Sequence, residues 1–145
     1  MTDNKDGKEN PDALQENPQL NLYQKELEKD VELNLANIRE KSMFVSSIRA
    51  KWLGHYAKEK ENLDRIKRNK TKLMAVKTAA AGQQSVLRLK SDAILTEGDE
   101  KIKRLDELRR ITEANIDYIE HVFNILDGFG FQIKNTIELL KLERS

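Results

Sequence analysis

The residues of this sequence best suited to binding a ligand form a basic run between positions 65 and 90. The run contains eight lysine or arginine residues and no carboxylate, and the next acid is Asp92. Opposite charges four residues apart stabilise a helix, and here the acidic partners are missing. The run therefore predicts either a binding surface for a polyanion, most simply a nucleic acid, or a lysine-rich helix face exposed to solvent.

The absence of aromatic residues near this run indicates how a nucleic acid would be contacted. No aromatic residue lies between Tyr56 and Tyr118, whereas recognition of unpaired bases normally uses aromatic side chains as stacking platforms. We therefore expect contacts to phosphates and little sequence preference. On a helix, Arg65, Arg68 and Lys72 fall within about 60° of one another. They face away from Ile66 and Leu73. The candidate DNA-binding residues are Arg65, Lys67, Arg68, Lys70, Lys72 and Lys77.

Other residue types that could support chemistry are few and scattered. His55 and His121 are the only histidines, cysteine is absent, and no cluster has metal-ligand spacing. The segment from Gly128 to Phe131 lacks the Lys-Ser/Thr of a phosphate-binding loop. Trp52 falls on an apolar helix face, which favours a core or interface position over base stacking. We predict that the protein is not an enzyme and needs no cofactor or metal.

Composition places the basic run between two acidic regions. Residues 1–34 hold nine acids against four bases, residues 35–64 four against six, residues 65–91 none against eight, and residues 92–145 twelve against eight. The net charge is only +1 over 145 residues, a length typical of one domain. The acidic start does not resemble a signal peptide, and no apolar run approaches the roughly 20 residues of a membrane span.

The apolar pattern predicts an all-α protein that begins with an acidic tail. Residues 1–19 are polar, with two prolines, and we expect them to be a disordered tail before a single helical domain at 20–145. Within this domain, an apolar stripe predicts a short helix at 21–32. A seven-residue spacing then predicts one long basic helix at 35–81, with Glu59 as the gap in its seam. The seam residues are Ile38, Val45, Trp52, Ile66 and Leu73.

The second half of the chain predicts a partner for that helix. We interpret 83–98 as a connection and 99–127 as helical, with a kink or turn at Gly128 and Gly130 before a terminal helix that ends near Leu142. A helix of some 45 residues spans about 70 Å and must pack along another helix or chain. We expect a helical hairpin-like protomer that assembles into a homo-oligomer. The last helix has an apolar face that is wide for its length.

Several segments, in their order and spacing, resemble the UvsY family of recombination mediators of large tailed phages. They are 25–31 (KELEKDV), 51–53 (KWL), 63–66 (LDRI) with the basic run, and 130–134 (GFQIK). The resemblance implies a ring-shaped homo-oligomer that binds single-stranded DNA, helps displace the phage single-strand-binding protein and loads a phage RecA-type recombinase. It further implies a role in the host-cell cytoplasm during infection, with no cofactor and no membrane. In the family the C-terminal segment is associated with assembly, which implies 99–142 as the oligomerisation region, with Phe129, Ile133, Ile137 and Leu140 as candidate assembly residues.

This sequence departs from the UvsY family at the family's DNA-binding motif, Lys-Ala-Arg-Leu. The ungapped register places this motif on 75–78 (AVKT), where Lys77 keeps a positive charge and Ala75 replaces the lysine. We expect Arg68 and Lys72, in the turns before, to take over its role.

Two other classes of function remain open from the sequence. One is a helical scaffold or adaptor whose basic face is only exposed to solvent or docks an acidic partner. The other is an amphipathic protein of the membrane surface, which is disfavoured because the cationic stripe has no exposed apolar flank.

Overall fold

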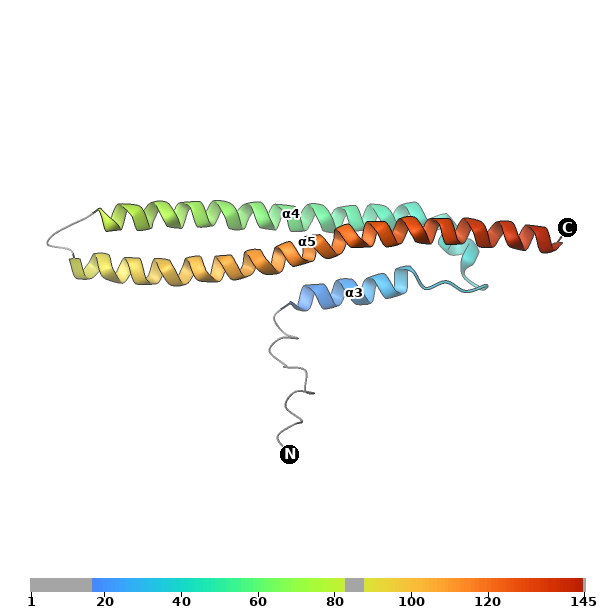
Figure 1. Ribbon diagram of the computed structural model, residues 1–145, viewed down its shortest axis with the longest axis horizontal. Coiled ribbons are helices and arrows are strands. Elements are labelled where there is room, and N and C mark those ends of the chain that lie inside the picture. The colour runs from blue at the N-terminus through green and yellow to red at the C-terminus, as the bar shows by residue number, and fades with distance from the viewer. Residues whose placement is uncertain (1–16, 83–87, 145) are drawn as a thin grey trace, which may run out of the picture. The chain divides into compact units, whose positions relative to one another are not determined.

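The computed structural model describes residues 17–82 and 88–144, with side chains from residue 95 onward in the second range. This part of the chain is built from α-helices. They are α3 (Pro18–Asp30), α4 (Ile38–Ala81) and α5 (Arg88–Arg144) (Figure 1). The all-α fold of long helices predicted from the sequence is confirmed. None of the helices within the described residues combines the length and the hydropathy that crossing a membrane requires.

The first helix begins earlier than its apolar stripe predicts. The Oδ1 atom of Asn17 accepts a hydrogen bond from the backbone N–H of Leu20 at 3.1 Å, and Pro18 occupies the first helical turn. Both are favoured at a helix start, because a cap satisfies a free N–H and proline lacks one. The predicted tail therefore ends too late: residues 17–19 belong to α3 and its cap, while residues 1–16 lie outside the described residues.

The loop between α3 and α4 is fixed by two asparagines. The Oδ1 atom of Asn34 accepts from the N–H groups of Ala36 and Asn37, both at 2.9 Å, and the Oδ1 atom of Asn37 accepts from the N–H of Asn34 at 2.8 Å. Such side-chain bonds compete with helix formation and favour turns. They explain why α4 begins at Ile38 and not at Leu35.

The final helix is longer and more regular than predicted. It runs unbroken from Arg88 to Arg144, so the interpretation of 83–98 as a connection is wrong from residue 88 onward, and 83–87 lie outside the described residues. No kink occurs at Gly128 or Gly130 (Figure 1). A helical glycine costs about 1 kcal/mol relative to alanine. Burial of Leu126, Phe129 and Ile133 around these glycines outweighs that cost.

Contacts divide the chain into two units, and α4 and α5 pass through both. The first unit takes in the chain up to Ala57 and from Asn115 onward, and the second is Lys58–Ala114. In each unit the two long helices are antiparallel. As α4 advances by seven residues, its partner on α5 retreats by seven. The pairs are Arg49–Asp127 and Tyr56–Glu120 in the first unit, and Lys70–Asp106 and Lys77–Asp99 in the second.

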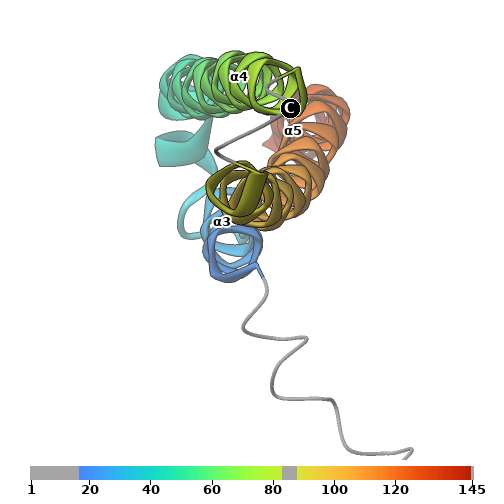
Figure 2. The ribbon, with the colours of Figure 1, turned by 90° about the vertical axis from the view of Figure 1, so that its left-hand side faces the viewer.

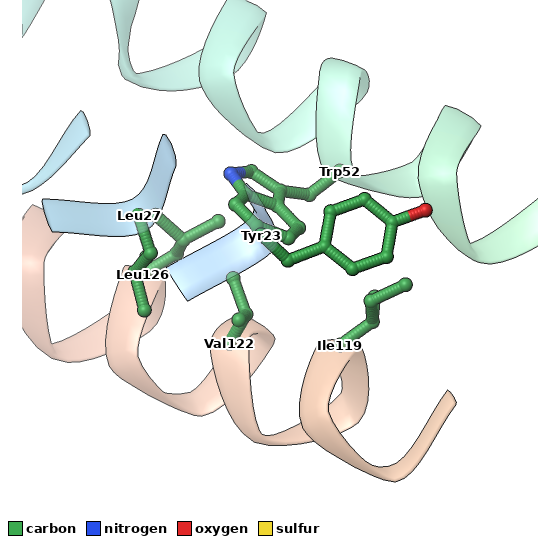
Figure 3. Packing of buried hydrophobic residues seen from close by; sticks show 6 residues of the cluster. All are labelled: Tyr23, Leu27, Trp52, Ile119, Val122 and Leu126. Carbon is green, nitrogen blue, oxygen red and sulfur yellow. The ribbon is translucent and has the colours of Figure 1, made fainter. Parts of the chain in front are cut away.

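The core of the first unit surrounds Trp52, whose side chain has no solvent exposure (Figure 3). Figures 1 and 2 show α3 alongside the part of α5 in this unit. Tyr23 of α3 lies 5.7 Å from the Trp52 ring, between centroids. The indole N–H donates to Asp30 Oδ2 at 2.8 Å, and Lys51 donates to the same carboxylate at 2.7 Å. The buried cluster comprises Tyr23, Leu27, Trp52, Ile119, Val122 and Leu126.

The second unit has a thinner core. Leu63 and Ala80 are its buried apolar residues among those described, and Ile66 and Leu73 are half-buried. Glu59, the predicted gap in the apolar seam, is only 3% exposed, and Thr112 of α5 is buried too. The seven-residue pattern therefore positions a residue inward even where that residue is polar.

We predict that Trp52→Phe lowers the free energy of unfolding by about 1–3 kcal/mol. The change leaves a cavity among α3, α4 and α5 and removes the N–H donor from Asp30. Urea unfolding at one fixed protein concentration, followed by circular dichroism, measures the effect. Leu53→Ala is the control, because that neighbouring side chain is 52% exposed. An equal loss in both variants would contradict the central role of Trp52.

We predict that Gly128→Ala raises the free energy of unfolding by about 0.5–1 kcal/mol. An added Cβ at Gly128 meets no atom within 4 Å, and no glycine in the described residues has a positive φ. The reverse change Ala57→Gly, at another exposed helical position, should cost a similar amount. A destabilised Gly128→Ala variant would show that this face is covered by something in solution.

Candidate nucleic-acid interface

The six predicted DNA-binding residues all lie on α4 within the second unit. Arg88 and Lys90, at the other end of the basic run, fall in the first turn of α5, and their side chains are not described. The basic run is therefore helical, except for residues 83–87, which lie outside the described residues. It is divided between two antiparallel helices.

Four of the six side chains are exposed and carry unneutralised charge. Among the described residues, no carboxylate forms an ion pair with any of them. Ile66 and Leu73, on the other side of the helix, are half-buried in the seam. The predicted separation of a cationic stripe from an apolar seam is thus present in the structure. The exposed stripe consists of Arg65, Arg68 and Lys72, and Lys67 is exposed at least about 100° around the helix from them.

The other two predicted residues have a different environment. Lys70 Nζ lies 2.7 Å from Asp106 Oδ1, and Lys77 Nζ lies 2.5 Å from Asp99 Oδ1. Both lysines are half-buried and follow Leu63 at seven-residue intervals, so they occupy seam positions. The structure therefore gives Lys70 and Lys77 a role in joining α4 to α5. Lys77 is also the one cation retained at the family motif.

Two cations on α5 lie next to the stripe and were missed by sequence reasoning. Lys101 and Arg104 line one groove together with Lys72 of α4. These two cations were overlooked because the region from residue 92 onward has an acidic net charge. Their i,i+3 spacing beside the seam residue Leu105 is visible in the sequence. Only the antiparallel register, however, shows that they lie beside Lys72.

The acids of this part of α5 are largely engaged with basic residues of the same helix. Arg110 donates to Glu107 and lowers the pKa of that carboxyl. Glu97 lies 3.0 Å from Lys101, and Arg109 lies 2.9 Å from Glu113. These are exposed pairs within one helix, and exposed pairs contribute little to stability.

His55, one of the two histidines in the first unit, packs against α3. His55 Nε2 lies 2.7 Å from Glu26 Oε2, and its ring lies 5.0 Å from Tyr23 and 5.1 Å from Trp52, between centroids. It thereby joins α4 to α3. Across residues 17–82 and 88–144, no group of three or more His, Cys, Asp or Glu side chains is arranged to hold a metal ion.

The four predicted assembly residues divide into two pairs. Phe129 and Ile133 are 4% and 3% exposed and pack against Ile38 inside the protomer. Ile137 and Leu140 instead line an open groove at the end of the first unit, formed by the start of α4 and the end of α5. Within the protomer, only this second pair remains accessible to another chain.

Comparisons with known proteins identify the family and the fold of this chain. The family model described as "Recombination, repair and ssDNA binding protein UvsY" matches residues 26–145. A crystal structure of the recombination mediator protein UvsY of bacteriophage T4 is similar, with a TM-score of 0.77 and 18% identity, covering 86% of this chain and 98% of that one. At that identity the likeness shows a shared fold. A search of curated proteins found no match. Because the family model spans most of its length, the chain belongs to the UvsY family of recombination, repair and single-stranded-DNA-binding proteins.

Proposed function

We propose that the chain binds single-stranded DNA through the exposed stripe of α4 and acts as a mediator of phage recombination. One observation carries the proposal: four cations of an acid-free run are exposed and unpaired among the described residues, in a chain whose family is described as binding single-stranded DNA. The protein helps displace the phage single-strand-binding protein and load the RecA-type recombinase, in the host cytoplasm and without a cofactor.

Electrostatics determines the character of this binding. Each phosphate that a lysine or arginine neutralises releases counterions, so affinity falls as salt rises. The stripe offers charge without aromatic platforms, which favours backbone contact over base-edge reading. A mediator has to act on whatever sequence the exposed strand carries, and phosphate contact meets that need.

We predict that Arg68→Ala with Lys72→Ala weakens binding to a single-stranded oligonucleotide. The log–log salt slope should become shallower by about 1.4, or about 0.7 for each lost phosphate contact. Fluorescence anisotropy over a salt series measures both quantities. The loss should be similar on unrelated sequences, because phosphates carry no sequence information.

The matched control is Lys70→Gln with Lys77→Gln. It removes the same net charge from the same helix, but from side chains paired with Asp106 and Asp99. Its salt slope should stay close to that of the unmodified chain. Equal slopes for the two double variants would mean that total charge, and not the stripe, governs binding.

The mediator role is measured with the same variants in a recombinase ATPase assay on a strand coated with single-strand-binding protein. The unmodified chain should restore recombinase activity, and Arg68→Ala with Lys72→Ala should not. A chain that binds the strand yet leaves the recombinase inactive would instead be a DNA-binding scaffold.

We further propose that the protein forms a ring-shaped homo-oligomer through the groove at the end of the first unit. Ile137 and Leu140 line this groove with Leu35, which is 76% exposed. Apolar side chains that line an open groove favour association, because burial removes their surface from water.

We predict that Leu35→Gln with Leu140→Gln lowers the mass measured by size-exclusion chromatography with light scattering, because both side chains line the groove. Helix content should stay unchanged, because Leu35 precedes α4 and Leu140 lies near the end of α5. Leu108→Gln is the control, with a leucine 49% exposed in the second unit. A monomeric unmodified chain at micromolar concentration would contradict assembly. An unchanged mass in the double variant would place the interface elsewhere.

A further inference from the structure

A groove lies beside the stripe on α4. Phosphate contacts by the stripe alone would leave this groove unused. The groove lies within the second unit and has a volume of about 450 Å³, in the size range of ligand sites. Three of its lining residues come from each long helix. They are Asn69, Lys72 and Leu73 of α4, and Lys101, Arg104 and Leu105 of α5.

The chemistry of the groove differs from that of the stripe. Its lining is mostly apolar, and Leu73 and Leu105 are half-buried seam residues, whereas Lys72, Lys101 and Arg104 are exposed. A bare phosphate would gain nothing from an apolar wall. The groove suits a ligand that has a flat apolar face and carries negative charge close to it.

The carboxylates that pair with cations of the groove are held only weakly. Lys72 has no ion-pair partner among the described residues. Lys101 lies 3.0 Å from Glu97, and Arg104 lies 3.9 Å from Glu100, with every side chain in these two pairs at least half exposed. Exposed pairs of this kind contribute little to stability, so phosphates can replace the carboxylates.

We propose that this groove receives an unpaired base of the DNA strand, while Lys72, Lys101 and Arg104 contact the adjoining phosphates. The inference rests on the proposed function and adds a base-binding site that spans α4 and α5. The planar guanidinium of Arg104 supplies a stacking surface where aromatic residues are missing. A duplex keeps its bases stacked and paired, so the groove distinguishes a single strand from a double strand.

The test measures binding of the full-length chain to three probes: a 20-nucleotide thymidine oligonucleotide, an oligonucleotide of the same length made of abasic sites, and a duplex. The unmodified chain should bind the thymidine strand roughly tenfold more tightly than the abasic strand, since the abasic strand has no base to stack in the groove. Lys101→Ala with Arg104→Ala should abolish most of this preference. It should also make the salt slope shallower by about 1.4.

Two further variants separate stacking from charge. Arg104→Lys keeps the positive charge but removes the planar group, so the salt slope should be retained while the preference for bases falls. The control is Lys103→Ala with Lys134→Ala. It removes two exposed cations of α5 that do not line the groove, and it should retain the preference.

Each contrary result has a distinct meaning. Equal affinity of the unmodified chain for thymidine and abasic strands would overturn this inference and leave the proposed function intact. Failure to bind any single strand would overturn both. A lower oligomer mass in Lys101→Ala with Arg104→Ala would show that the groove is an interface between copies of the chain, which would also overturn the inference.

Discussion

A pair of antiparallel helices has a single buried seam, and this constraint governs the rest of the structure. In the second unit α4 and α5 are the only described helices, so most of the circumference of each faces solvent. The seam accepts Leu63, the half-buried lysines paired with α5, and even the buried Glu59. Every cation that falls off the seam is exposed, and the stripe follows directly from that geometry.

The first unit has a larger buried core because a third helix, α3, packs against the two long helices. α3 places Tyr23 and Leu27 over Trp52, and its carboxylates bind the polar atoms at the rim of that cluster. Asp30 satisfies the buried indole N–H, which would otherwise cost about 1–3 kcal/mol. The buried cluster therefore contains no residue of the stripe. Substitutions in the stripe should leave the cluster around Trp52 undisturbed.

How far the sequence predicts this structure depends on whether the signal is local or between helices. The seven-residue pattern predicted α4, the burial of Trp52 and the outward direction of Arg68, because each follows from the helical repeat alone. The kink predicted at the glycines of α5 is absent. The prediction considered only the local cost of a helical glycine, about 1 kcal/mol, and not the apolar burial that offsets it. The difference between Lys70 and Lys72, and the proximity of Arg104 to the stripe, depend on which α5 residues oppose α4.

Under the proposed function, the departure of this sequence from the family's DNA-binding motif has a physical explanation. The register places it on 75–78, where Lys77 keeps its charge but is paired with Asp99. The unpaired cations lie one to three turns earlier, on the outward face. A base-reading site could not be displaced in this way, because its donors must meet particular base edges. A phosphate chain repeats along the strand, so a helix can move its cations by a turn and still find a phosphate for each. What such a site has to preserve is the face of the helix, and the seam fixes that face.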